Sequence, residues 1–210
     1  MAPNLDTAQL VALAAALGWA SGIRLYAVVF LTGLAGTLGW VPLPPGLQVL
    51  QTPLVLWASG AMLVMEFLAD KIPLVDSLWD AVHTVIRIPA GAALAAGVFG
   101  GAIGGDHASW ALVAALAGGT LAAASHTTKA TTRAAVNTSP EPLSNVGVSL
   151  LEDGLVVGAL WLAVEHPVAF FVGLAVALAA SALLVVWLWR FLGALVRRLR
   201  GWMGGTPSAA

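Results

Sequence analysis

The stretch EFLADKIPLVDSLWDAVHTVIRIPAGA, residues 66–92, places acidic, basic and imidazole side chains in the middle of a very apolar chain. Of the 210 residues, 60% are hydrophobic and only 9% are charged, and the mean hydropathy is +0.92. Soluble domains average about 45–50% apolar and about 25% charged residues. The composition therefore predicts an integral membrane protein, in which the charges of residues 66–92 must avoid the lipid.

The composition also excludes several kinds of chemistry. The formal net charge is −1, so nothing indicates a nucleic-acid partner, and the chain has no cysteine. Disulfides, thiol nucleophiles and cysteine-bound zinc are therefore excluded. Four histidines without paired spacing argue against a dedicated zinc site, and whether another metal binds stays open. We expect no cofactor.

Long apolar runs predict six transmembrane helices, since a membrane-spanning helix needs about 20 mostly apolar residues. The turn VPLPPG, residues 41–46, separates the first two helices, and Ser109 is the expected N-cap of the fourth. The predicted helices cover about residues 8–38, 53–69, 75–104, 109–136, 146–164 and 167–195. We expect an all-α, polytopic membrane protein with one domain over residues 1–200 and a flexible C-terminal tail at 201–210.

The basic residues of the short connections predict the orientation in the membrane. Lys71 follows the second predicted helix, Lys129 and Arg133 lie just before the fourth connection, and further arginines lie near the C-terminus. The first, third and fifth connections contain no lysine or arginine. Both termini are therefore expected in the cytoplasm.

The two halves of the chain resemble each other. Residues 53–73 align with residues 147–167 without a gap, with five identities in 21 positions. The alignment predicts two repeats, about residues 8–104 and 108–195, with three helices each and therefore with opposite orientations. Inverted repeats of this kind are common in secondary transporters, and they also occur in other membrane proteins.

Two of the predicted helices carry a polar stripe. At 100° per residue, the stripe residues of each helix fall within about 60° on one face. The stripe in residues 75–104 is Asp76, Asp80, His83 and Arg87, and the stripe in residues 109–136 is His126, Lys129 and Arg133. The two basic residues of the second stripe are four positions apart and repel each other unless an anionic group lies between them.

Ionisable groups at membrane depth are costly, so we expect them to face the bundle interior and to pair. The expected pairs join Asp76 and Asp80 to Lys129 and Arg133. Three more ionisable residues complete the expected cluster: Arg24, Glu152 and Asp153. Glu66 and Asp70 lie four positions apart and share a face at the cytoplasmic end of the second predicted helix. Because buried ion pairs add little net stability, we expect the cluster to line a water-filled cavity on the cytoplasmic side. A purely structural electrostatic core is the alternative.

The stretch GVFGGAIGG, residues 97–105, is rich in glycine. Small residues at this spacing permit close contact between helices. The contact either lies inside the bundle or joins two copies of the chain in a homo-oligomer, and the sequence leaves both open.

The charged segments also carry a family resemblance. Their recurring pieces are Asp-Lys-x-Pro at 70–73, Val-Asp-x-x-Trp-Asp at 75–80, His-x-x-Lys-Ala-x-x-Arg at 126–133 and Glu-Asp at 152–153. Over roughly residues 20–167, the chain resembles a bacterial six-helix integral membrane family described only as a domain of unknown function. The chain departs from the family pattern at Ile88, which separates Arg87 from Pro89. Whether the helix kinks at this point stays open. The resemblance implies a bacterial inner membrane and this choice of site, and it implies no activity.

The function that fits these features best is transport of a small, anionic solute. The candidate residues for binding the solute are Arg24, Asp76, Asp80, His83, Arg87, His126, Lys129 and Arg133. The candidates for proton coupling are Glu66, Asp70, Glu152 and Asp153. The expected partners are membrane lipid and the small-molecule solute.

Two other functions stay open. In an enzyme acting on a lipid phosphate, Asp76 and Asp80 would bind Mg²⁺, and Lys129 and Arg133 would stabilise phosphoryl charge. The sequence contains no phosphatase or transferase signature, so we favour a function that is not enzymatic. In a noncatalytic scaffold subunit, paired neutral replacements in the cluster would be tolerated.

Overall fold

Helices are the only regular elements in the part of the chain that the structure describes. The computed structural model describes residues 5–72, 74–100, 107–138 and 142–203. Its elements are α1 (Thr7–Thr37), the 3₁₀ helix η1 (Pro45–Gln51), α2 (Pro53–Ala69), α3 (Val75–Phe99), α4 (His107–Val136), α5 (Pro142–Glu165) and α6 (Pro167–Met203). The prediction of an all-α protein is confirmed.

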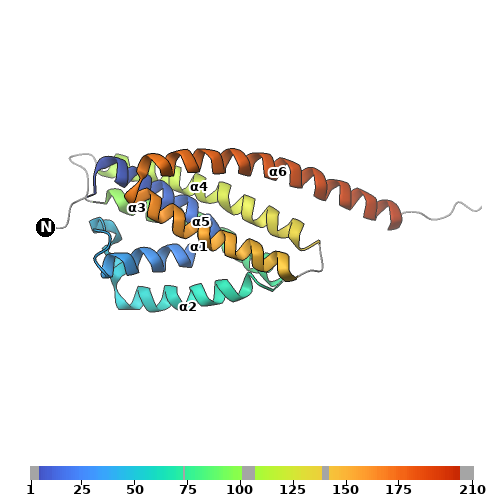
Figure 1. The fold of residues 1–210 in the computed structure, drawn as a ribbon, viewed down its shortest axis with the longest axis horizontal. Coiled ribbons are helices and arrows are strands. Elements are labelled where there is room, and N and C mark those ends of the chain that lie inside the picture. Colours follow the sequence, from blue (N-terminus) through green and yellow to red (C-terminus); the bar gives the residue numbers. More distant parts are fainter. Residues whose placement is uncertain (1–4, 73, 101–106, 139–141, 204–210) are drawn as a thin grey trace, which may run out of the picture.

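Most of the helices could cross a membrane. Five described helices are long and apolar enough to do so, and η1 with α2, bent by 68°, is a sixth candidate if the pair counts as one span. The helices lie along a common long axis, and α6 extends past the others (Figure 1). These apolar helices indicate a membrane protein.

Local sequence explains where several helices begin. Asp6 and Gln9 form a capping box at the start of α1, in which each side chain accepts a 2.8 Å hydrogen bond from the backbone N–H of the other. Prolines open α2, α5 and α6, where the missing N–H costs no helical hydrogen bond. Helix α3 continues through Pro89 to Phe99. Ser109 lies inside α4, which includes His107, so its prediction as an N-cap is wrong.

Helix α1 reverses direction at Arg24, which the sequence did not predict. Arg24 has non-helical backbone angles, φ −144° and ψ 85°. Leu13 from the first half and Thr32 from the second half line the same pocket, although a straight helix would separate them by about 28 Å. Both ends of α1 accordingly lie at the same end of the bundle (Figure 1). Arg24 is the tip of a helical hairpin.

The first half of α1 is the core of the bundle. Its residues from Ala12 to Ile23 are almost all buried. Gly22 packs so closely on α4 that a Cβ atom there would overlap the carbonyl oxygen of Ala122. The Ser125 hydroxyl of α4 donates a 2.6 Å hydrogen bond to the carbonyl oxygen of Trp19. This tightly packed half-helix therefore fixes the position of Arg24 within the bundle.

Replacing Gly22 with alanine is expected to lower the free energy of unfolding by about 1–3 kcal/mol, because the added methyl group forces α1 and α4 apart. The measurement is thermal unfolding of the purified protein in detergent. Gly154→Ala in α5 is the matched control, since a Cβ at Gly154 meets no atom within 4 Å. An equal loss of stability in both variants would contradict the close contact.

The glycine-rich segment packs within the chain as far as it is described. The N–H of Gly46 donates a 3.1 Å hydrogen bond to the carbonyl oxygen of Gly100, and Gly97 lies against Gly46 and Leu47. Residues 101–105 lie outside the described residues. Contact between two copies of the chain stays a prediction.

Other expectations differ from the structure. The inverted repeat is not confirmed, since α1 reverses whereas α4, its expected counterpart, is one continuous helix. Helix α6 continues to Met203, beyond its predicted end near residue 195. The start of α1 and the end of α6 lie at opposite ends of the bundle (Figure 1). The cytoplasmic location of both termini stays a prediction.

Candidate functional site

Five helices bring their ionisable side chains together in one continuous network of ion pairs, which we call the ion-pair cluster. Its members are joined by N–O distances of 2.6–3.9 Å. They are Arg24 of α1, Glu66 and Asp70 at the end of α2, Asp76, Asp80 and Arg87 of α3, Lys129 and Arg133 of α4, and Glu152 and Asp153 of α5. All three arginines are fully buried.

Asp70 is the centre of the cluster. Its Oδ2 lies 2.8 Å from Lys129 Nζ, 3.2 Å from Arg24 Nη2 and 3.6 Å from Arg133 Nη2. Asp70 follows α2 directly and caps it, with its N–H bonded to the carbonyl oxygen of Glu66. Burial alone would raise the pKa of this carboxyl group, but the three nearby cations outweigh it and hold the pKa below its usual value.

Arg87 joins α3 to α2. It donates hydrogen bonds of 2.6 Å to Asp80 Oδ1 and 2.7 Å to Glu66 Oε1. Asp80 and Arg87 lie seven residues apart and therefore on the same face of α3. The guanidinium group thus has a carboxylate on each of its two terminal nitrogens.

Arg133 joins α4 to α5 and to the end of α2. Its Nε and Nη2 donate to the two carboxylate oxygens of Glu152, at 3.2 and 2.8 Å, which is bidentate geometry. Its Nη1 donates to the backbone carbonyl oxygens of Asp70, at 2.8 Å, and Asn145, at 3.2 Å.

One cation of the cluster also bonds a backbone oxygen beside the reversal of α1. Lys129 Nζ donates a 3.0 Å hydrogen bond to the carbonyl oxygen of Ile23, the residue before the tip. Arg24 itself contacts Asp153 Oδ1 at 2.7 Å and Ser149 Oγ at 2.7 Å. Irregular backbone at membrane depth requires such partners, so the cluster and the helix reversal stabilise each other.

The two histidines of the predicted stripes have different positions. His126 reaches the cluster, because its Nδ1 lies 3.3 Å from Arg87 Nη1. His126 Nε2 lies 2.7 Å from Thr84 Oγ1, and the Thr84 hydroxyl also donates a hydrogen bond to the carbonyl oxygen of Asp80. His83 lies beside the cluster, stacked on Trp79 and hydrogen-bonded to the Tyr26 hydroxyl at 3.2 Å.

The structure brings the predicted site residues together, with His83 at their edge, and it contains the expected ion pairs, although these are not the shortest. Lys129 and Arg133 lie 3.6 and 3.9 Å from their expected partners Asp80 and Asp76. Their shortest contacts, both 2.8 Å, are with Asp70 and Glu152 instead. Each cation of α4 therefore contacts acidic groups from three other helices or their ends.

Sequence reasoning missed several polar residues around the cluster. Asn137 Nδ2 donates a 2.8 Å hydrogen bond to Asp76 Oδ1, and Asn137 Oδ1 accepts from Asn145. Ser149 accepts from both Arg24 and Lys71. Asparagine and serine are common in turns and helix caps, so their presence alone does not indicate a buried site. The only signal was their position in or beside apolar helices, where buried polar residues are rare.

The cluster carries more negative than positive groups. It has six acidic and four basic side chains, so it holds two excess negative charges when fully ionised. Lys71 lies at its edge, over the Phe67 ring, and would reduce the excess to one. Four buried carboxylate oxygens have no hydrogen-bond donor among the described residues: Glu66 Oε2, Asp70 Oδ1, Asp76 Oδ2 and Asp80 Oδ2.

The expected water-filled cavity at the cluster stays a prediction. Three pockets between the described helices are lined by residues outside the ion-pair cluster. The charged side chains contact one another directly. Within the described ranges, no group of three or more histidine, aspartate and glutamate side chains has the arrangement of a metal site.

The comparisons with known proteins identify the family. Residues 11–190 match the family described as "Domain of unknown function (DUF4126)", so the chain belongs to that family. This confirms the resemblance predicted from the charged segments. No curated protein and no solved structure matches the chain.

Proposed function

We propose that this member of the DUF4126 family is a proton-coupled membrane transporter and that the ion-pair cluster is its proton-binding site. The observation that carries the proposal is the excess of carboxylates in a cluster whose members are all buried except Asp153, which is 30% exposed. Uncompensated charge is costly in a low-dielectric interior, and a carboxylate there is neutralised by binding a proton. A cluster with two more acids than bases is therefore suited to take up and release protons.

The reversal of α1 supports the same proposal. Transporters commonly bind ions where a membrane helix is interrupted, because the interruption leaves backbone groups free near the middle of the membrane. Helix α1 is interrupted at Arg24, and five residues of the cluster and its surroundings, from the end of α2, α4 and α5, lie within 4 Å of Arg24 or bond the backbone beside it. Movement of the hairpin tip would change these contacts and thus the proton affinity of the acids.

The charge balance favours a cationic solute over the anionic solute expected from the sequence. Each basic residue of the cluster already has at least two carboxylates within 4 Å. An anion would have to displace one of them, whereas a cation or a proton adds to an acidic excess. We therefore propose exchange of protons for a cation.

The same contacts weigh against the two alternatives. Lys129 and Arg133 are occupied by Asp70 and Glu152 and are not free to stabilise a phosphoryl group. One oxygen of each of Asp76 and Asp80 already accepts a hydrogen bond, from Asn137 and Arg87 respectively. Balanced ion pairs would be sufficient in a scaffold, and the excess of acidic groups would contribute nothing to that role.

The proposed orientation follows from the position of the basic residues. The ends of α2, which Lys71 follows, α4 and α6 lie at the end of the bundle opposite to the start of α1 (Figure 1). The positive-inside rule puts that end in the cytoplasm. We therefore propose a cytoplasmic end for α6 and an external start for α1, in a bacterial inner membrane.

The proposal is tested in liposomes that contain the purified protein, an acidic interior and an enclosed pH-sensitive dye. Tetraalkylammonium and benzyltrimethylammonium ions added outside are expected to release protons from protein-containing liposomes and not from empty ones. Glu66→Gln removes one of the excess acids and is expected to slow the release. Proton release that no added cation increases, or that is equal in empty liposomes, would contradict the proposal.

A further inference from the structure

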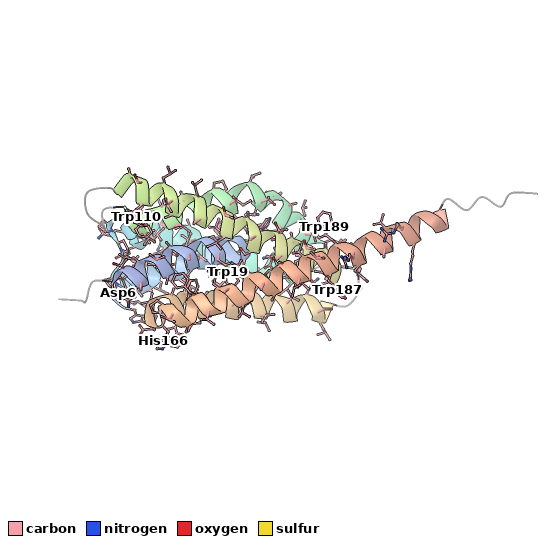
Figure 2. The ribbon with its side chains drawn as sticks, turned by 90° about the horizontal axis from the view of Figure 1, so that it is seen from above. Asp6, Trp19, Trp110, His166, Trp187 and Trp189 are labelled. Carbon is pink, nitrogen blue, oxygen red and sulfur yellow. The ribbon has the colours of Figure 1, made fainter. Side chains whose placement is uncertain are left out.

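We infer that a pocket at the end of the bundle opposite to the ion-pair cluster binds a hydrophobic organic cation of the ammonium class. The pocket lies between the two halves of α1, the segment after α1 and the last turns of α5, and has a volume of about 280 Å³. Its wall is mostly leucine, valine and alanine, with Thr32, Trp40, Trp161 and Glu165 as the other residues. Figure 2 marks this end of the bundle by Asp6 and by His166, the residue after Glu165.

The charge of the pocket selects a cation. Glu165 is the single ionisable residue among those that line it. The pocket also lies beside the C-terminal ends of α1 and α5, at Thr37 and Glu165. A helix C-terminus carries partial negative charge, so the helix ends and the carboxylate both favour binding of a cation.

The rest of the lining selects an organic cation over an inorganic one. A hydrated metal ion loses water only where oxygen ligands replace it, and an aliphatic wall offers none. Trp40 and Trp161 are 73% and 56% exposed, and indole faces attract alkylammonium groups, whose charge is spread over carbon. A pocket of about 280 Å³ is close to the lower size limit of small-molecule sites.

Thr32 supplies an independent sign of a ligand. Its side chain lines the pocket and is 5% exposed, and its hydroxyl has no hydrogen-bond partner among the described residues. Thr37, one turn later, donates instead to the carbonyl oxygen of Gly33 at 2.9 Å. A buried hydroxyl without a partner is costly, and a hydroxyl or carbonyl group on the ligand would satisfy it.

The inference deepens the proposed function by naming the class of solute, but its test measures binding and needs no transport. Benzyltrimethylammonium is titrated into the protein in lipid nanodiscs and followed by calorimetry, with protein-free nanodiscs as the blank. Neopentylbenzene, its neutral isostere, and benzenesulfonate, an anion, are the matched ligands. Saturable binding of the ammonium ion alone is expected.

Three variants locate the site. Glu165→Gln is expected to weaken ammonium binding about tenfold, which corresponds to about 1.4 kcal/mol. Ala35→Phe fills the pocket and is expected to abolish binding, whereas Ala177→Phe in a second, purely apolar pocket is expected to leave it unchanged. Thermal unfolding of each variant verifies that it folds.

The inference is overturned if Glu165→Gln binds as tightly as the wild type, or if benzenesulfonate binds equally well. Binding of neopentylbenzene with the same affinity would also overturn it and would make the pocket a site for lipid chains. If Ala35→Phe does not fold, the ammonium affinities of Glu165→Gln and the wild type still test the inference. Failure of the liposome experiment together with normal binding would reject transport and keep the site.

Discussion

Asp70→Asn is expected to lower the free energy of unfolding by about 3–5 kcal/mol, the range for breaking a buried ion pair by removing one partner. Asp70 Oδ2 lies within 4 Å of Arg24, Lys129 and Arg133. An amide in its place has no charge and leaves these cations with fewer anions. The measurement is unfolding of the detergent-solubilised protein by increasing mole fractions of SDS.

Asp153→Asn is the control for this prediction. The Asp153 side chain contacts only Arg24 among the basic residues of the cluster and is 30% exposed. Arg24 keeps Asp70 and Glu152 within 4 Å in this variant, so the control is expected to lose less stability than Asp70→Asn. Equal losses in the two variants would show that Asp70 is not the centre of the cluster.

The pKa of Asp70 adds a dependence on pH. Because the folded protein holds this pKa below its usual value, the ionised carboxylate contributes stability above the pKa of the unfolded state. That contribution is lost as the pH falls through the lowered pKa. The wild type is therefore expected to lose stability on acidification, and Asp70→Asn is expected to lack this part of the loss.

The sequence predicted the helices and the members of the cluster for clear reasons. Helical periodicity places residues spaced by four and seven positions on one face, and the cost of charge in lipid turns that face inward. Both rules hold for Asp80 and Arg87, which share a face of α3 and form a 2.6 Å ion pair.

The reversal at Arg24 could not be predicted by the same rules. Residues 7–37 have the length and hydropathy of one membrane span, and no proline marks the tip. The only local signals are one arginine in a long apolar run and the small residues Ser21 and Gly22 before it. The reversal depends instead on distant partners such as Lys129, which bonds the carbonyl oxygen of Ile23.

The central place of Asp70 was equally hidden. In the sequence it follows the second predicted helix and adjoins Lys71, outside the two polar stripes. In the structure it is fully buried, because the end of α2 meets α4 and the tip of α1. Which acid pairs with which base depends on these helix positions, and periodicity carries no information about them.

The double variant Lys129→Gln with Asp80→Asn is expected to abolish cation-driven proton release and to leave the protein folded. The two side chains lie 3.6 Å apart, and the variant removes one positive and one negative charge, so the acidic excess stays the same. The amide that replaces the Lys129 ammonium group can still donate a hydrogen bond toward the carbonyl oxygen of Ile23. The measurements are proton release in the liposome assay and unfolding in SDS.

A structural cluster and a proton-binding site predict opposite results for this double variant. A structural cluster tolerates a balanced neutral pair, since replacing a buried ion pair by neutral groups is often close to neutral for stability. A proton-binding site does not, because Lys129 lies between Asp70, Asp80 and Glu152 and its charge sets the proton affinity of all three. Lys129→Arg is the control that keeps the charge and is expected to retain proton release. A folded double variant with the proton release of the wild type would therefore reduce the cluster to a structural element.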